Sequence, residues 1–263
     1  MKNRWAILIA GIIIQTILGG LYAWSIFVPA LIDSYGLSRG QCGVIFGLCI
    51  TFFAVAMIAG GRLLAARGPR LTAFTGAMLF AAGYAVAGAS HGNYLVLLLG
   101  ISVLSGCGIG FGYVCPLTVG MQWFPERKGL ITGVAVAGFG GGAILLSSVA
   151  AHVLGGGMDV LRFFAWIAVV PGGMLVLAAL VLDVPAQAKR VSTGAGAASD
   201  LLSLPFLICL SGIFVGTFSG LLVVGNLAPI VEGTGMSTEL AATAISVFAA
   251  GNAVGRILWG FLF

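Results

Sequence analysis

Long apolar runs separated by short polar segments make up most of this chain. A bilayer core about 30 Å thick is crossed by roughly 20 apolar residues in a helix. That length divides the sequence into eight predicted membrane-spanning helices. Their approximate bounds are residues 5–32, 41–64, 71–90, 94–120, 129–154, 161–182, 202–231 and 240–263. The pattern therefore predicts an all-α membrane protein embedded in a lipid bilayer.

One internal segment, residues 183–200, is poor in large apolar residues and rich in small and polar ones. This composition is typical of a flexible linker between two helical bundles. We expect an N-terminal six-helix bundle over residues 1–183, a cytosolic linker over 184–200, and the first two helices of a second bundle over 201–263. Because the sequence ends in the last apolar run, we expect a truncated chain, a fragment of a longer protein.

The basic residues predict the orientation in the membrane. With the N-terminus in the cytoplasm, nine fall on the inner side: Lys2, Arg4, Arg62, Arg67, Arg70, Arg127, Lys128, Lys189 and Arg190. Only Arg39 and Arg162 fall on the outer side. An excess of Lys and Arg on cytoplasmic loops is the rule for such proteins. We therefore expect a multi-pass protein of the cell membrane with a cytoplasmic N-terminus.

Composition agrees with this class: 60% of the residues are hydrophobic and 7% are charged, against about 25% charged in soluble domains. The net charge of +5 comes from residues at helix ends, so it predicts no nucleic-acid partner. The five cysteines form no Cys-x-x-Cys pair, and His91 and His152 have no partners at ligand spacing. We expect no metal, no cofactor and no enzymatic activity.

Arg256 is the one basic residue inside an apolar segment. Placing an arginine near the centre of a membrane helix costs about 2.5–3.5 kcal/mol, so such a residue usually faces a water-filled cavity or an anionic partner. Asn252 lies one helical turn before it. We expect both residues to bind a substrate, with Arg256 pairing with an anion. The alternative is that Arg256 lies near the cytosolic helix end and extends to the surface.

Two tyrosines are further candidates for substrate binding. In the first run, Gln15, Gly19, Tyr22 and Pro29 fall near one face at helical spacing. Tyr22, and Tyr113 in the fourth run, can each donate a hydrogen bond to a carboxylate, whereas filling a gap between helices is an equally good interpretation. The third and sixth runs, including Phe163 and Phe164, have almost no polar groups and are expected to face lipid.

Glycines are concentrated in the fourth and fifth runs. Gly106, Gly108, Gly110 and Gly112 lack the spacing of a dinucleotide site and are expected to allow close helix contact. With Gly138 and Gly141 in the next run, they form smooth surfaces able to slide during a conformational cycle. A static bundle would use them equally well.

The loop over residues 61–70 resembles the signature of the major facilitator superfamily, Gly-x-Leu-x-Asp-Arg-x-Gly-x-Arg. It matches at Gly61, Leu63, Gly68 and Arg70, whereas alanines occupy the Asp and Arg positions, at 65 and 66. The resemblance implies a major facilitator fold and a gating role for Gly61, Gly68 and Arg70. The missing acidic residue implies that the latch is weak here or carried by another group.

Two stretches, residues 19–27 and 123–133, resemble the oxalate:formate antiporter family and the monocarboxylate transporters. The resemblance implies a monomeric secondary transporter of small carboxylate anions. We expect Arg256 to bind the substrate carboxylate, with Tyr22, Tyr113, Asn252 and Gln15 around it. In the antiporter family a second cation comes from a later helix, beyond residue 263. A proton-coupled monocarboxylate carrier is the alternative, and a membrane receptor or structural protein is a third class.

Overall fold

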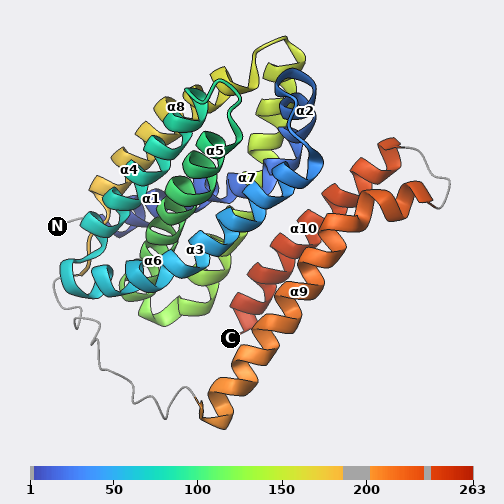
Figure 1. Cartoon of the computed structure of the whole chain (residues 1–263). Coiled ribbons are helices and arrows are strands. Elements are labelled where there is room, and N and C mark those ends of the chain that lie inside the picture. Colours follow the sequence, from blue (N-terminus) through green and yellow to red (C-terminus); the bar gives the residue numbers. More distant parts are fainter. Residues whose placement is uncertain (1–2, 186–201, 234–237, 263) are drawn as a thin grey trace. The chain divides into compact units, whose positions relative to one another are not determined.

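The computed structural model describes residues 3–185, 202–233 and 238–262, and every regular element in these ranges is a helix. The chain divides into two compact units, and the larger contains the bundle shown from α1 to α8 in Figure 1. The bundle elements are α1 (Arg4–Gly19), η1 (Gly20–Ile26), α2 (Val28–Tyr35), α3 (Arg39–Arg67), α4 (Pro69–Gly88), α5 (Tyr94–Leu97), η2 (Leu98–Ser105), α6 (Gly106–Trp123), η3 (Pro125–Arg127), α7 (Lys128–Gly155) and α8 (Val160–Val181). The later helices are α9 (Leu204–Gly233) and α10 (Thr238–Leu262).

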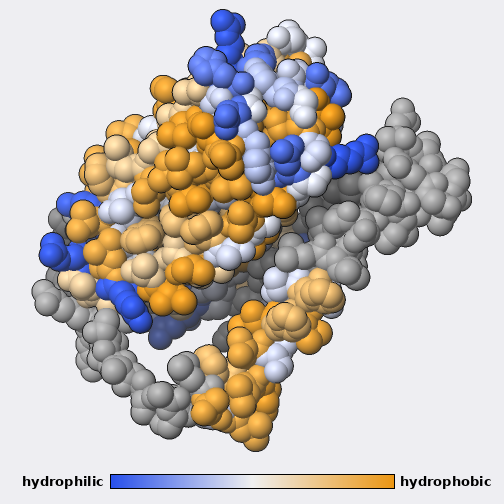
Figure 2. Space-filling model, viewed as in Figure 1, coloured by the Kyte–Doolittle hydropathy of each residue, from blue (hydrophilic) through white to orange (hydrophobic). Residues whose placement is uncertain are grey.

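Six stretches of the described chain are long and apolar enough to cross a membrane, which confirms the predicted six-helix bundle. They are Arg4–Ile26, Arg39–Arg67, Pro69–Gly88, Tyr94–Trp123, Pro125–Gly155 and Val160–Val181, here called spans 1 to 6. Figure 2 shows hydrophobic residues along the side of the bundle and hydrophilic ones gathered toward its ends. That distribution suits a bilayer, in which apolar side chains meet lipid and polar ones meet water.

Local sequence signals explain where several helices begin and end. Ser38 and Gln41 form a reciprocal capping box at the start of α3, and Asn93 accepts two main-chain N–H bonds at the start of α5. Gly68 has a φ of 87° between α3 and α4, a left-handed conformation that favours glycine. Pro69 then occupies the first turn of α4, where a missing N–H is harmless.

The glycines of α6 allow two neighbouring helices to approach it closely, as the sequence predicts. A Cβ on Gly106 would lie 2.7 Å from the carbonyl oxygen of Cys49 in α3. On Gly108, it would lie 2.7 Å from the carbonyl oxygen of Gly76 in α4. Glycines two residues apart thus serve different partners, because they face different sides of α6.

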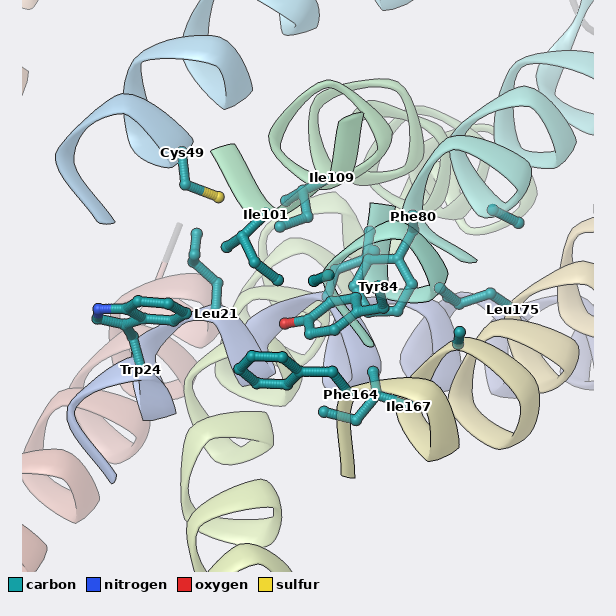
Figure 3. Close-up of a cluster of buried hydrophobic side chains, with 14 of the residues drawn as sticks. Leu21, Trp24, Cys49, Phe80, Tyr84, Ile101, Ile109, Phe164, Ile167 and Leu175 are labelled. Atoms are coloured by element: carbon teal, nitrogen blue, oxygen red, sulfur yellow. The ribbon is translucent and has the colours of Figure 1, made fainter. Parts of the chain in front are cut away.

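Side chains from spans 1, 2, 3, 4 and 6 form the core in Figure 3, where the rings of Trp24, Tyr84 and Phe164 lie together. The centroids of Trp24 and Phe164 are 6.4 Å apart, and those of Tyr84 and Phe164 are 5.9 Å apart. The Trp24 indole also donates a hydrogen bond to the carbonyl oxygen of Cys42, at 3.1 Å. Phe163 and Phe164 are fully buried. The expectation that they face lipid is wrong, because Phe163 packs against Phe27, and Phe164 packs against Trp24, Phe27 and Tyr84.

Two spans depart from a continuous α-helix. Span 1 changes from α1 to a 3₁₀ segment at Gly20–Ile26 and resumes as α2. Of the residues predicted to share a face of span 1, Gln15 is buried and Tyr22 is exposed. Span 4 contains a π-helical segment at Leu98–Ser105.

Candidate functional site

Tyr22 and Tyr113, predicted independently, contact the same ring. Tyr22 of η1 and Tyr113 of α6 both meet Phe139 of α7 edge to face, with centroid distances of 5.6 and 5.1 Å and interplanar angles of 85° in both pairs. Phe53 of α3 lies 5.4 Å from Tyr113 and 6.1 Å from Phe139. We call Tyr22, Phe53, Tyr113 and Phe139 the aromatic cluster. It joins spans 1, 2, 4 and 5.

Glycines bring Tyr22 close to Phe139. A Cβ on Gly19 would collide with the carbonyl oxygen of Phe139, and one on Gly142 would collide with the carbonyl oxygen of Thr16. The backbones of span 1 and α7 therefore touch directly, which only glycine permits at these two positions. This contact places Tyr22, with 43% of its surface exposed, beside the almost fully buried Phe139.

Gln15 of α1 contacts the backbone of one member of the aromatic cluster and has no accessible surface. Its amide nitrogen Nε2 donates to the main-chain carbonyl oxygen of Tyr113 at 3.4 Å. The structure thus brings together two predicted site residues that are 98 positions apart. The contact between them uses the backbone of Tyr113, and the Gln15 side chain is enclosed by protein.

Asn252 and Arg256 both lie in α10, one turn apart. The side chain of Arg256 lies outside the described residues. The interpretation of Arg256 as an anion-binding residue therefore stays a prediction from the sequence.

The predicted gating residues Gly61, Gly68 and Arg70 lie at one end of the bundle, which we call the Arg70 end. Arg70 pairs with Asp183, which follows α8, at 3.4 Å. The Trp123 indole donates to the main-chain oxygen of the same Asp183 at 2.7 Å. Asp183 therefore supplies a carboxylate to Arg70 although the loop signature lacks its own acidic residue. The gating role of these residues stays a prediction.

Gly138 and Gly141 of α7 have different surroundings. A Cβ on Gly138 would make ordinary contact with Thr16, 3.4 Å from its Oγ1, whereas one on Gly141 would have nothing within 4 Å. Gly138 thus faces span 1 and Gly141 faces open space. The close approach of span 1 to α7 depends instead on Gly142 and Gly19.

The opposite end of the bundle, here called the Tyr35 end, is joined by a short hydrogen bond. The Tyr35 hydroxyl donates to Oδ2 of Asp159 at 2.6 Å, while Oδ1 of Asp159 accepts from the main-chain N–H groups of Leu161 and Arg162. Burial and this carboxylate raise the pKa of Tyr35 to about 12. Burial alone would raise the pKa of Asp159. The hydrogen bonds that its carboxylate accepts have the larger effect, so its pKa lies below the ordinary value.

Several of these residues carry no signal in the sequence. Phe139 is an apolar residue within a glycine-rich run, and Phe53 is one of several aromatics in span 2. Only their contacts with Tyr22 and Tyr113 in the structure identify Phe53 and Phe139 as members of the candidate site. Asp183 and Asp159 are acidic residues next to apolar runs, which suggests helix ends but not their partners. Within the described chain, no group of three or more His, Cys, Asp or Glu side chains is placed to hold a metal ion.

A family model described as Major Facilitator Superfamily matches residues 5–263. The chain belongs to the Major Facilitator Superfamily. Members of this superfamily are membrane carriers and not enzymes. A solved superfamily structure, a proton:xylose symporter called XylE and bound to 6-bromo-6-deoxy-D-glucose, has a TM-score of 0.68 over 97% of this chain and 68% of its own, at 14% identity. At that identity the match shows the shared fold.

Two curated superfamily relatives extend over essentially all of the chain. An uncharacterized transporter of the superfamily, YhjX of Escherichia coli, is 29% identical over 99% of this chain and 66% of its own length. The oxalate:formate antiporter of Oxalobacter formigenes is 27% identical over 100% of this chain and 64% of its own. The chain therefore spans somewhat less than two thirds of the length of these two relatives.

Proposed function

We propose that this chain belongs to a secondary transporter that carries small organic carboxylates by alternating access, as an anion exchanger of the oxalate/formate type. The observation that supports this most directly is the convergence of Tyr22 and Tyr113 on Phe139. Phenol hydroxyls donate hydrogen bonds to carboxylates, and aromatic edges carry a partial positive charge. The likeness to an oxalate:formate antiporter along the whole chain supports the same substrate class.

In this proposal Arg256 neutralises the substrate. A carboxylate leaving water needs a paired cation, and the aromatic cluster contains none. The planar guanidinium of arginine binds a carboxylate through two parallel hydrogen bonds, and Asn252 adds a polar group one turn away. The transporter acts as a monomer in the cell membrane, with its N-terminus in the cytoplasm.

Exchange is favoured over proton coupling by the position of the acidic residues. In the described bundle Asp33, Asp159 and Asp183 lie outside the six spans, and Glu126 lies in the first turn of span 5. A proton-coupled monocarboxylate carrier is the second candidate, since residues 19–27 and 123–133 resemble both groups.

Substitution of Arg256 in a full-length protein carrying this sequence tests the proposal. Hydrogen bonds to charged groups contribute about 1.5–3 kcal/mol, so Arg256→Gln should weaken binding of a labelled dicarboxylate roughly 10- to 100-fold. Arg256→Lys keeps the charge but loses the planar geometry, so its affinity should be intermediate. Arg39→Gln removes an exposed cation at the start of α3 and serves as the matched control. Unchanged affinity in Arg256→Gln would remove the main reason for an anionic substrate.

The coupling mode is tested in proteoliposomes of the same protein. An exchanger should take up labelled oxalate only when the vesicles contain a carboxylate, and collapsing the pH gradient should leave the rate unchanged. Uptake into empty vesicles that follows an imposed pH gradient would favour the proton-coupled carrier.

A further inference from the structure

The contact between α1 and α6 contains a buried acceptor without a donor. The carbonyl oxygen of Tyr113 can only accept, so the Gln15 group facing it must be the amide nitrogen. That orientation fixes the amide oxygen Oε1 on the other side. Gln15 has no accessible surface, and its Oε1 has no hydrogen-bond partner in the described part of the chain. A buried acceptor in this state destabilises the fold.

Pro116 leaves a second buried acceptor, the main-chain oxygen of Gly112, without its helical donor. Pro116 lies inside α6 and has no N–H to donate to the carbonyl of Gly112, four residues earlier. Gly112 and Pro116 both face α1: a Cβ on Gly112 would lie 2.7 Å from Cδ1 of Leu18, and one on Gly11 would lie 3.2 Å from Cβ of Pro116. Gln15 lies between Gly11 and Leu18 on α1. The two acceptors therefore lie along the same helix contact.

Two acceptors cannot bond to each other, and a hydroxyl side chain could serve only one of them. A water molecule has two O–H groups and can donate to both. We propose that one buried water binds between Oε1 of Gln15 and the main-chain oxygen of Gly112.

Space of the right size exists along this contact. A small cavity along the contact is lined in part by Gly11, Ile12 and Pro116, one turn from the acceptor residues, and by neither Gln15 nor Gly112. A water needs room for about one molecule and two to four polar partners. The cavity is lined mainly by apolar groups, so the water binds beside it, between the two oxygen atoms.

The water gives Gln15 two connections to α6. Its Nε2 holds the carbonyl of Tyr113, and its Oε1 holds the preceding carbonyl through the water. Spans 1 and 4 are thereby joined by a polar bridge beside Pro116 of α6.

A double-mutant cycle on the purified chain tests the bridge. Gln15→Leu removes one acceptor, and Pro116→Ala supplies the missing N–H to Gly112, so each variant removes one of the water's two partners. Their shifts in thermal midpoint should be non-additive by roughly 2–4 °C, because both act on the same water. Gln122→Leu, the same substitution two turns along α6, is the matched control and should be additive with Pro116→Ala. Gln15→Met replaces Gln15→Leu if that variant does not fold.

Additive shifts for the Gln15 and Pro116 pair would overturn the proposal. A high-resolution map of the protein provides the direct check. Density for a water about 2.7–3.2 Å from both oxygen atoms supports the site, and a dry contact between Gln15 and Gly112 overturns it.

Discussion

At the scale of single residues, the Tyr35–Asp159 hydrogen bond combines stability with a defined dependence on pH. It joins the last residue of α2 to the N-cap residue of α8, 124 positions further along the chain, at 2.6 Å. The ionised carboxylate and the protonated phenol are both required. The hydrogen bond stabilises the protonated form of Tyr35, which contributes to its raised pKa, and the ionised form of Asp159, which contributes to its lowered pKa.

Tyr35→Phe should lower the free energy of unfolding by about 1.5 kcal/mol near neutral pH, the lower end for a hydrogen bond to a charged group. The Asp159 contribution is present above its ordinary pKa of 3.8 and is lost as pH falls through its lower folded value. The Tyr35 contribution is complete below its ordinary pKa of 10.0 and is lost as pH rises through about 12. Denaturation of wild type and variant at several pH values measures the difference.

Tyr94→Phe removes a phenol hydroxyl at the same end of the bundle and is the control, with little change expected at any pH. A Tyr35→Phe effect that persists unchanged in strong acid would contradict the assignment, because the protonated Asp159 no longer carries the charge that strengthens the bond.

At the scale of elements, the length of the apolar runs located the spans but not their internal changes of helix type. Apolar run length depends only on the composition of each segment, so the six spans of the bundle could be predicted among the eight expected. The 3₁₀ segment after Gly19 and the π segment around Gly100 adjoin places where another backbone comes very close, at Phe139 and at Gly83. Such contacts depend on residues distant in sequence, which a single-segment pattern does not contain.

The candidate site shows the same division. Tyr22 and Tyr113 were predictable because a hydroxyl in an apolar run is conspicuous. Phe139 was not, because nothing in its own segment distinguishes it from a residue that faces lipid. The orientation of Gln15 toward the backbone of Tyr113 likewise depends on the packing of α1 against α6.

The contact of span 1 with α7 predicts opposite effects for two adjacent glycines. Gly142→Ala should destabilise the bundle by about 1–3 kcal/mol or more, because its Cβ collides with the Thr16 carbonyl. Gly141→Ala meets nothing within 4 Å and should be neutral or stabilising by roughly 0.5–1 kcal/mol, since alanine favours a helix over glycine. Thermal denaturation of the two variants compares them directly. Equal destabilisation by both would contradict the close backbone contact.

At the scale of the whole molecule, the distribution of basic residues predicts which end of the bundle lies in the cytoplasm. In a background without native cysteines, Ala66→Cys near the Arg70 end should react with an impermeant maleimide only after the cells are permeabilised. Met158→Cys at the Tyr35 end, where 41% of the side chain is exposed, should react in intact cells. Ala66 is exposed as well, so accessibility alone does not separate them. The reverse pattern of labelling would invert the predicted orientation.

We expect that the aromatic cluster alone is not sufficient for carboxylate transport, which needs the whole protein. The cluster offers two phenols and no cation, and a carboxylate bound without a paired cation loses more hydration energy than two neutral hydrogen bonds return. Residues 1–263 do contain Arg256, but they span less than two thirds of the length of the two relatives that match the whole chain. Proteoliposomes containing residues 1–263 alone should therefore show no saturable carboxylate exchange above empty vesicles. A full-length protein carrying this sequence should exchange under the same conditions, and its Arg256→Gln variant should exchange poorly at low substrate concentration. Saturable exchange by residues 1–263 would mean that these helices already form a complete site, and the dependence on further helices would be wrong.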